Sequence, residues 1–194
     1  MTFGTGETLK PAVFLDRDGT INVEKNYLFR VEDFEFIDGV PAAIRRLNRA
    51  GLPVVVITNQ SGIARGFYGL SEVETLHRHV DRLLAVAGAR IDAWYICPHL
   101  PDYSSAKCDC RKPAPGLLLR AAAERGIDLA RSWMVGDKPA DIRAGLSVGC
   151  GSILVKTGYG NTAVAEAMEL KVPVVETLVE AVDLILRPGS GLTL

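Results

Sequence analysis

Short apolar runs that alternate with helical patterns are the feature that most limits the fold of this chain. Each run is rich in Val and Ile and is bounded by polar or turn-forming residues, as in strands buried on both faces. Such strands alternating with helices predict a parallel sheet covered by helices on both faces. The expected fold is therefore α/β, a doubly wound parallel sheet of Rossmann type. The expected strands are Ala12–Leu15, Val54–Ile57, Ala93–Ile96, Trp133–Val135 and Ile153–Val155.

Helix start and stop signals lie between these runs. Pro41 suits a first helical position, and Gly51 follows the expected end of that helix. Ser71 and Glu74 have the spacing of a capping box, ahead of an apolar face that runs to Ala87. Further helices are expected at Leu117–Arg125, from Pro139 onward, and around Val179–Leu186.

Length and charge exclude several classes of protein. One domain accounts for all 194 residues, because single cores serve chains of up to roughly 250 residues. The formal net charge of −1 argues against a nucleic-acid partner. No apolar run approaches the ~20 residues of a membrane-spanning helix, and no apolar signal-peptide core is present at the start. We expect a cytoplasmic monomer without a membrane partner, with flexible stretches at 1–10 and 188–194.

Polar residues follow three of the expected strands at their carboxyl ends. Asp16 and Asp18 follow the first strand, Thr58 the second, and Asp137 the fourth. Ligands of open α/β sheets bind outside the carboxyl ends of the strands, so these residues are expected to converge. Asp16 and Asp18 alone would be equally compatible with a solvated turn. Three neighbouring carboxylates, however, need a hard cation to hold them together, and Mg²⁺ is the natural choice.

This set of residues has a chemical logic. A carboxylate attacks a phosphate dianion only when cations shield the repulsion, and a second acid must protonate the leaving alcohol. Asp16 fits the nucleophile and Asp18 the general acid. Lys112 and the Thr58 hydroxyl are placed to interact with the oxygens of a bound phosphoryl group.

Three of the four cysteines lie in the stretch CPHLPDYSSAKCDCRKP, residues 97–113. Cys97, His99, Cys108 and Cys110 form two closely spaced pairs that match a tetrahedral zinc shell. A disulfide between Cys108 and Cys110 would close a strained ring. Four protein ligands leave no open position, so the zinc would be structural. It would fix the loop 97–110 and thereby the directions of Arg111 and Lys112.

Four segments taken together resemble the motifs of the haloacid dehalogenase superfamily of phosphatases. They are FLDRDGT (14–20), VITNQSG (56–62), CRKP (110–113) and VGDKPAD (135–141). The resemblance implies that Asp16 becomes an aspartyl-phosphate and that Asp18 acts first as acid and then as base. It implies Mg²⁺ binding by Asp16, the Asp18 carbonyl and Asp137. About twenty residues separate Gly19 from Pro41, too few for the cap domain of many members.

The zinc loop narrows the resemblance to two groups, the phosphatases that remove the C7 phosphate of heptose 1,7-bisphosphate and the histidinol-phosphate phosphatases. The segment Ser61–Gly66 is similar to the first group, while the second remains an alternative. A polynucleotide 3′-phosphatase is more distant, and a non-catalytic zinc-stabilised module that binds sugar phosphates is the alternative outside enzymes. The resemblance implies substrate contacts by Glu24, Lys25, Asn26, Tyr27, Thr58, Asn59, Gln60, Ser61, Arg111, Lys112 and Lys138, with Asn26 standing where Gly is expected.

Four other polar or sulfur-containing residues have ordinary structural interpretations. Asp141 suits a helix-capping role at the third position of the helix that begins at Pro139, with an outer role toward Mg²⁺ as the lesser alternative. His77 and His79 are expected on the surface of their helix. Cys150 is expected to be a small buried apolar side chain.

Overall fold

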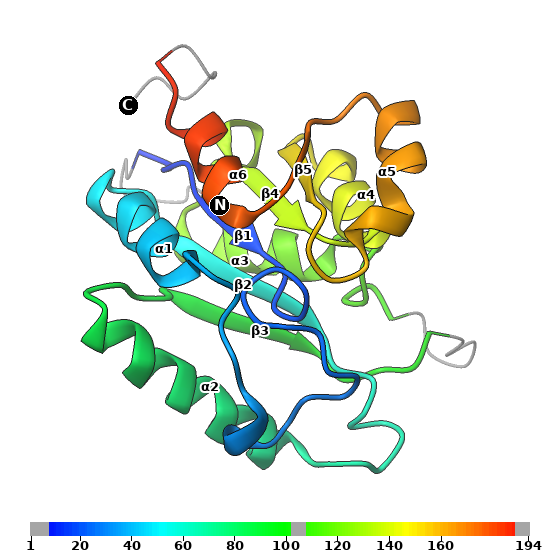
Figure 1. Cartoon of the computed structure of the whole chain (residues 1–194). Helices are drawn as coiled ribbons and strands as arrows, with labels where there is room; N and C mark the ends of the chain where they lie inside the picture. Colours follow the sequence, from blue (N-terminus) through cyan, green and yellow to red (C-terminus); the bar gives the residue numbers. More distant parts are fainter. Residues whose placement is uncertain (1–7, 102–107, 189–194) are drawn as a thin grey trace, which may run out of the picture.

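A six-stranded parallel sheet forms the centre of the protein in the computed structural model, which describes residues 8–101 and 108–188 (Figure 1). The strand order is β3-β2-β1-β4-β5-β6, and every neighbouring pair is parallel. This arrangement confirms the predicted doubly wound α/β fold. The strands are β1 (Val13–Leu15), β2 (Val54–Asn59), β3 (Ala93–Cys97), β4 (Trp133–Gly136), β5 (Gly151–Val155) and β6 (Val174–Val175).

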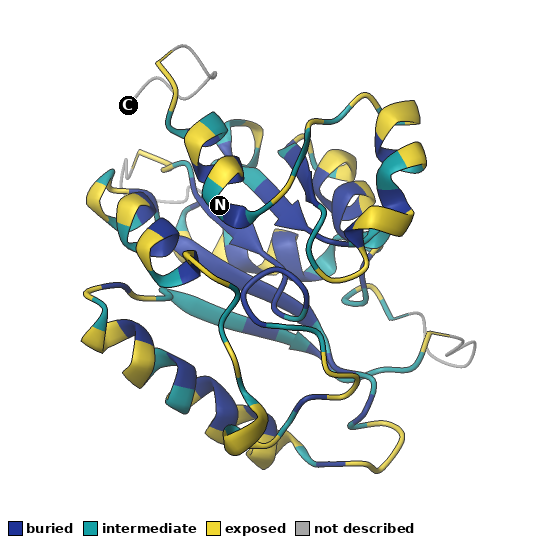
Figure 2. Cartoon of the chain, viewed as in Figure 1, coloured by how far each residue is buried: buried dark blue, intermediate teal, exposed yellow. Residues whose placement is uncertain are grey.

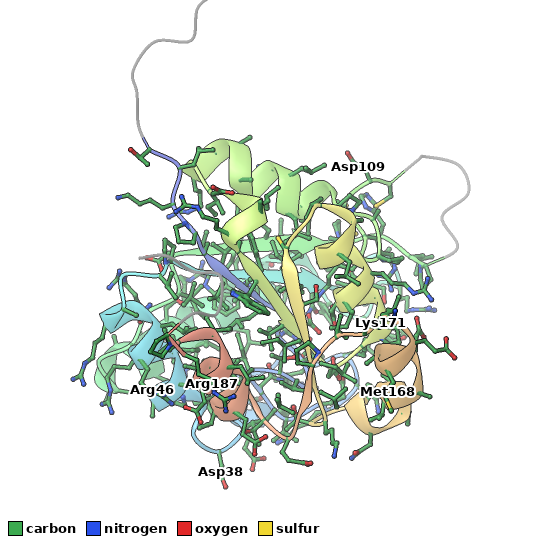
Figure 3. All side chains as sticks on the ribbon, turned by 90° about the horizontal axis from the view of Figure 1, so that it is seen from above. Asp38, Arg46, Asp109, Met168, Lys171 and Arg187 are labelled. Carbon is green, nitrogen blue, oxygen red and sulfur yellow. The ribbon has the colours of Figure 1, made fainter. Side chains whose placement is uncertain are left out.

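Helices cover both faces of this sheet. One face packs against α1, α2 and α6, and the other against α3 and α4, with α5 beside α4 (Figure 1). Seen from above, Arg46 and Arg187 lie on one side of the sheet and Asp109 on the other (Figure 3). The helices are α1 (Val40–Arg49), α2 (Leu70–Val86), α3 (Gly116–Arg125), α4 (Pro139–Ser147), α5 (Gly160–Glu169) and α6 (Leu178–Ile185), with short 3₁₀ turns η1 (Val31–Asp33) and η2 (Leu129–Arg131).

The central strands are buried on both faces, as the unbroken apolar runs predict (Figure 2). Successive residues of β1 alternate between two cores. Val13 and Leu15 join the core with α1, α2 and α6, whereas Phe14 joins the core with α3. Cys150 is buried in this second core, as predicted.

Several boundaries differ from the sequence predictions. The structure adds α5 and β6, which had no clear apolar pattern. The predicted capping box of Ser71 and Glu74 is wrong. The helix begins two residues earlier, with Gly69 as its N-cap, and the carboxylate of Glu72 accepts a hydrogen bond of 2.9 Å from the Gly69 N–H. Glycine is a common N-cap residue but has no side chain that could mark the helix start in the sequence. Glu72 is the residue that could have indicated this start.

Most of the two chain ends lies outside the part of the chain that the structure describes. Residues 1–7 and 189–194, which hold most of the predicted flexible stretches, lie outside the described residues, whereas the Lys10 N–H bonds to the Gly126 carbonyl at 3.0 Å. In the described part of the chain, no helix is both long and apolar enough to span a membrane. Between β1 and α1 the described elements include only the turn η1, which agrees with the absence of a cap domain.

The strand order places a topological switch point between β1 and β4. From β1 the chain builds the sheet outward through β2 and β3, and from β4 it builds in the opposite direction through β5 and β6. Leu15 pairs with Val135, so the residues that follow these strands emerge side by side. Ligands of open α/β sheets bind in the crevice at such a point.

Candidate active site

Three buried carboxylates meet at the switch point. Asp16 follows β1, Asp137 follows β4, and Asp141 projects from the first turn of α4. Oxygens of all three lie within 4.8 Å of one another. The sequence predicted Asp16 and Asp137 here, while Asp141 takes the place expected for the side chain of Asp18. The cluster is therefore built from two strand ends and one helix start.

Two glycines enclose the carboxylate of Asp137. Gly19 and Gly158 both have left-handed backbone conformations, with φ of +83° and +57°. A Cβ atom at either position would collide with Oδ2 of Asp137. The Tyr159 N–H donates to that oxygen at 2.8 Å. Glycine is thus needed at both positions for conformation and for space.

The surroundings of Oδ1, the other carboxylate oxygen of Asp137, favour a cation at this site. Oδ1 is buried and has no hydrogen-bond partner among the described residues. Burial, followed by the charge of Asp16, raises the pKa of Asp137 to about 8. The nearest cation to Oδ1 is the Lys138 amine, at 3.9 Å, too far for a hydrogen bond. A buried carboxylate oxygen without a hydrogen bond costs free energy, and a divalent cation would offset that cost. The donor set of hard oxygens fits Mg²⁺.

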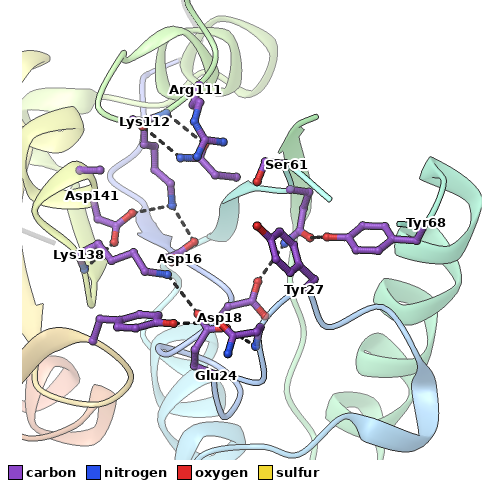
Figure 4. Close-up of a pocket in the computed structure, with 15 residues that line it drawn as sticks. Asp16, Asp18, Glu24, Tyr27, Ser61, Tyr68, Arg111, Lys112, Lys138 and Asp141 are labelled. Carbon is purple, nitrogen blue, oxygen red and sulfur yellow. Dashed lines mark hydrogen bonds and ion pairs between the residues drawn. The ribbon is translucent and has the colours of Figure 1, made fainter. Parts of the chain in front are cut away.

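Lys112 links two members of the cluster. Its Nζ atom lies 2.7 Å from Oδ1 of Asp16 and 2.7 Å from Oδ1 of Asp141 (Figure 4). Burial alone would lower the pKa of Lys112, but the charges of Asp141 and Asp16 raise it above its usual value. Asn59 holds the backbone of Lys112 through two hydrogen bonds of 3.1 Å. Lys112 is therefore a cation fixed directly beside Asp16.

Asp141 combines two roles. Its Oδ2 accepts a hydrogen bond of 3.0 Å from the Lys138 N–H, which confirms the predicted capping of α4. Its Oδ1 forms the ion pair with Lys112, which the sequence analysis did not predict. The carboxylate thus both caps the helix and orients the lysine of the site.

Asp18 is held apart from the carboxylate cluster by a set of donors. Its Oδ1 accepts hydrogen bonds from Arg17 and from Asn22, at 2.9 Å and 3.0 Å. Its Oδ2 accepts one of 3.0 Å from Gln60. Burial alone would raise the pKa of Asp18, but the charge of Arg17 and these hydrogen bonds hold it below its usual value. Asp18 is thus an ionised carboxylate in a fixed orientation.

Gln60 is the hub of this hydrogen-bond set. Its amide nitrogen donates to Asp18 and, at 2.8 Å, to the hydroxyl of Thr58. Its amide oxygen accepts a hydrogen bond of 2.8 Å from the hydroxyl of Tyr68. Gln60 is buried, and both ends of its amide are occupied within the protein. The structure therefore places it as a support for Asp18 and Thr58.

A cavity of about 300 Å³ opens above these groups (Figure 4). Most of the predicted site residues line it. Thr58 and Asp137 lie buried beneath it, and the Lys25 amine instead pairs with Glu35 at 3.0 Å. The lining residues are Asp16, Asp18, Glu24, Asn26, Tyr27, Asn59, Gln60, Ser61, Tyr68, Arg111, Lys112, Lys138, Ala140, Asp141 and Tyr159.

The four predicted zinc ligands form a second cluster beside this cavity. The Sγ atoms of Cys108 and Cys110 lie 3.1 Å apart, and His99 Nδ1 lies 3.1 Å from the first and 3.3 Å from the second. Cys97 Sγ is 3.6 Å from His99 Nδ1. Zinc bound at about 2.0–2.3 Å to four tetrahedral N and S ligands would separate them by roughly 3.5–3.8 Å, so the closest pairs need to move apart by only several tenths of an ångström. The cluster can therefore hold zinc.

Arg111 connects this cluster to the cavity. It follows Cys110 directly, and its Nη1 atom donates a hydrogen bond of 3.0 Å to the backbone carbonyl of His99. The guanidinium also lines the cavity. Its direction thus depends on the conformation of the loop that carries the sulfur ligands.

Comparisons with known proteins agree with this geometry. Residues 109–181 match the model of the HAD-hydrolase-like family. The chain is 48% identical over 162 residues to D-glycero-beta-D-manno-heptose-1,7-bisphosphate 7-phosphatase from Yersinia pestis, which spans 81% of this chain and 86% of that protein. It is also 48% identical over 161 residues to the same enzyme from Escherichia coli K12, across 80% of this chain and 84% of that protein.

The chain belongs to the heptose-bisphosphate phosphatase family of HAD-like hydrolases. A solved structure of this family, the D,D-heptose 1,7-bisphosphate phosphatase of B. bronchiseptica complexed with magnesium and phosphate, superposes with a TM-score of 0.84 at 35% identity. The superposition covers 91% of this chain and 98% of that one. Fold and sequence therefore give the same family.

The site of this heptose-bisphosphate phosphatase family member contains residues that the sequence analysis missed. Arg17 is completely buried next to Asp18, although arginine is rarely buried. His77 was expected on the surface, which is wrong. It is buried and stacks on Trp94 with ring centroids 3.9 Å apart. Tyr68 and Tyr159 reach the cavity from loops without a motif. The buried positions of Arg17 and His77 depend on each other, because the two side chains lie 3.4 Å apart.

Proposed function

We propose that the protein is a Mg²⁺-dependent phosphatase that removes the C7 phosphate of D-glycero-D-manno-heptose 1,7-bisphosphate through an aspartyl-phosphate. The observation that carries this proposal is the buried Asp16, held by Lys112 at the floor of a cavity that Arg111 and Lys138 also line. Relatives that match four fifths of the chain carry the name of that enzyme. A carboxylate nucleophile beside fixed cations suits attack on a phosphate dianion.

The carboxylate cluster would hold the magnesium ion. Asp16, Asp137 and the backbone carbonyl of Asp18 are its proposed ligands, and Oδ1 of Asp137, which accepts no hydrogen bond from the described residues, supports this choice. Bound there, Mg²⁺ would neutralise negative charge on the phosphate and on the cluster. Lys112 would contribute a second positive charge from the protein side.

Asp16 would attack the phosphorus of the C7 phosphate. A new bond forms between a carboxylate oxygen and phosphorus, while the bond from phosphorus to the C7 oxygen breaks. The departing oxygen takes a proton from Asp18, and a water molecule, losing its proton to Asp18, then attacks the same phosphorus. Inorganic phosphate leaves and Asp16 regains its carboxylate. Thr58 and Lys112 are proposed to stabilise the phosphoryl group.

The surroundings of Asp18 suit this double role. In the free protein its pKa is lowered, so it stands ready as a base. A bound phosphate dianion brings negative charge close to it, and a nearby like charge raises the pKa of a carboxylate. The proton needed for the first step would thus be taken up as substrate binds. Gln60 and Arg17 keep the carboxylate in place throughout.

The rest of the substrate would lie along the cavity. Glu24, Asn26, Tyr27, Ser61, Arg111 and Lys138 line it and are the proposed substrate contacts. Arg111 and Lys138 are the cations available for an anionic sugar. The polar groups of Asn59, Gln60 and Lys25 bond to other groups of the protein. We propose that these three residues stabilise the loops around the substrate.

A direct comparison of substrates tests the proposed function. Phosphate release from heptose 1,7-bisphosphate and from histidinol phosphate would be measured side by side with Mg²⁺ and compared as kcat/KM. We expect a strong preference for the bisphosphate. Preference for histidinol phosphate would keep the chemistry and replace the substrate assignment, which depends on the segment from Ser61 to Gly66.

The nucleophile assignment has its own test. Asp16→Asn should abolish turnover and leave the fold intact, because Lys112 keeps its partner Asp141. Trapping of radiolabelled phosphate on the protein should disappear in this variant. Tight binding of the bisphosphate by the unaltered protein without phosphate release would instead favour a non-catalytic binding module.

We also propose a cellular compartment and an oligomeric state for the protein. The four cysteines are free, and three of them form the proposed structural zinc site, which is typical of a reducing compartment such as the cytoplasm. We propose a monomer whose partner is the small sugar phosphate, without nucleic acid or membrane. Size-exclusion chromatography with light scattering tests the monomer directly.

A further inference from the structure

Tyr159 joins three parts of the active site. Its backbone N–H donates to Asp137, and its ring lies under the amine of Lys138, 4.8 Å from Nζ to the ring centroid. Its hydroxyl donates a hydrogen bond of 3.0 Å to the side-chain oxygen of Asn26. Tyr159 lies just before α5, in a loop far in sequence from the residue that its hydroxyl contacts.

Asn26 is where this contact matters. Asn26 and Tyr27 both have positive φ angles, +48° and +56°. Two successive residues other than glycine in the left-handed region are uncommon, and asparagine tolerates that region better than most residues. The position therefore suits glycine, and an asparagine there needs further support to remain in place.

Contacts on both sides supply that support. The Asn26 N–H donates to Oε1 of Glu24 at 2.9 Å, and Oε2 of Glu24 accepts from the Lys138 amine at 3.2 Å. With the contacts of Tyr159 to Lys138 and to Asn26, these bonds close a ring of four residues, in which Asn26 takes part through its backbone N–H and its side-chain oxygen. All four of these residues line the cavity. The ring ties the turn at Asn26 to the loops that follow β4 and β5.

We propose that Tyr159 is a positioning residue for substrate binding, whose hydroxyl holds Asn26 in its left-handed conformation and thereby keeps Glu24 and Tyr27 in place along the cavity. This inference rests on the proposed function for its substrate. It assigns to Tyr159 an effect through Asn26, and it makes the hydroxyl unnecessary wherever residue 26 is a glycine.

A double-mutant cycle tests the inference. The variants are Tyr159→Phe, Asn26→Gly and the two combined, each assayed for heptose 1,7-bisphosphate with saturating Mg²⁺. Tyr159→Phe removes only the hydroxyl, and an exposed hydrogen bond of this kind is worth about a two- to fivefold change in KM. We expect that rise in KM to exceed any fall in kcat. On the Asn26→Gly background, the same tyrosine substitution should change KM no further.

Tyr95→Phe is the matched control. The Tyr95 hydroxyl also donates to a side chain, Glu124 on α3, at 2.8 Å, but Tyr95 does not line the cavity. Its removal should leave KM unchanged. An unchanged KM in Tyr159→Phe would overturn the inference. An equal rise on both backgrounds would also overturn it, since the hydroxyl would then act on the substrate directly.

A second measurement separates this inference from the proposed function. Failure of the wild-type protein to hydrolyse heptose 1,7-bisphosphate would refute the function alone. The cycle is then read from unfolding free energies in urea, which require no substrate. Coupling between residues 26 and 159 would support the inference, and additive effects would overturn it.

Discussion

The guanidinium of Arg17 lies against the carboxylate of Asp18, with Nε and Nη2 3.1 Å and 2.9 Å from Oδ1. The Arg17 side chain has no exposed surface. Nη2 also donates to the Leu28 carbonyl at 2.9 Å, and Nη1 lies 3.4 Å from Nε2 of His77. A buried cation with a single carboxylate partner depends on that partner, and the carboxylate in turn is oriented by it.

We expect Arg17→Met to destabilise the protein strongly. The substitution leaves Asp18 without its cation, and breaking a buried ion pair from one side costs about 3–5 kcal/mol. Urea unfolding at neutral pH would measure the loss. Arg46→Met is the matched control, because Arg46 forms an ion pair of 2.6 Å with Asp183 on the surface, and both side chains are over two fifths exposed. That loss should be about 0–1 kcal/mol. Equal losses in the two variants would contradict the role given to Arg17.

His77 should make stability depend on pH. Burial, followed by the charge of Arg17, lowers the pKa of His77 to about 3, from the usual 6.5 of a histidine. Between pH 6.5 and pH 3 the unfolded chain therefore binds a proton that the folded protein does not, so stability falls as the pH falls through this range. For this group the loss from pH 7 to pH 5 is about 2 kcal/mol.

His77→Phe should remove this part of the pH dependence. Phenylalanine keeps an aromatic ring over Trp94 but cannot take up a proton. Urea unfolding of wild type and variant at pH 7 and pH 5 isolates the effect, because the other titrating groups are common to both. The free-energy difference between the two proteins should move in favour of the variant at the lower pH. A constant difference would show that His77 does not titrate on unfolding.

Most of the fold could be predicted from the apolar runs that form the strands. The strands of this sheet are buried on both faces by long-range packing, so their apolar runs are visible in sequence and only their ends shift by one or two residues. β6 has two residues, Val174 and Val175, which are too few to give a pattern. Helix α5 has the sequence GNTAVAEAME, whose small residues give only a weak apolar pattern on the buried face.

The active site was predictable where chemistry and strand ends coincide. Asp16 and Asp137 follow buried strands, and the sheet itself brings them together. Arg17 and His77 could not be found this way, because Arg17 contacts His77 of α2 and His77 stacks on Trp94 of β3, and neither contact shows as a local pattern. Tyr159 likewise meets Asn26 only after folding, since 133 residues separate them.

Loss of a sulfur ligand should release zinc and weaken substrate binding. Cys108→Ser removes one of four ligands whose atoms lie within 4.8 Å of one another. Elemental analysis should give about one zinc per chain in the wild type and far less in the variant. KM for the sugar phosphate should rise about tenfold, because the loop that bonds Arg111 through the His99 carbonyl is no longer fixed.

Cys150→Ala is the control for loss of a thiol. Cys150 is buried in the same core as Cys97 but is not one of the four clustered ligands, so this variant should keep its zinc. Its KM should match that of the wild type even if its stability is lower. Zinc-free wild-type protein with an unchanged KM would rule out the positioning role of the metal.

Magnesium should stabilise the folded protein through Asp137. A ligand at a hundred times its Kd raises the unfolding free energy by about 2.7 kcal/mol when it binds only the folded state. Asp137→Asn removes the carboxylate whose Oδ1 accepts no hydrogen bond from the described residues, so Mg²⁺ should stabilise this variant far less. Thermal unfolding with and without MgCl₂ measures both. Asp183→Asn, at an exposed ion pair, should respond to Mg²⁺ like the wild type.

Without a divalent cation the difference in stability between the wild type and Asp137→Asn should change with pH. The pKa of Asp137 is raised to about 8 in the folded protein, from the usual 3.8 of an aspartate, mainly by burial. Between these values the folded state holds a proton that the unfolded chain has released, so the wild type loses stability as the pH rises. Asp137→Asn has no such proton, and in EDTA it should gain on the wild type from pH 5 toward pH 8. A stability difference between the two proteins that stays constant with pH in EDTA would show that Asp137 does not take up a proton on folding.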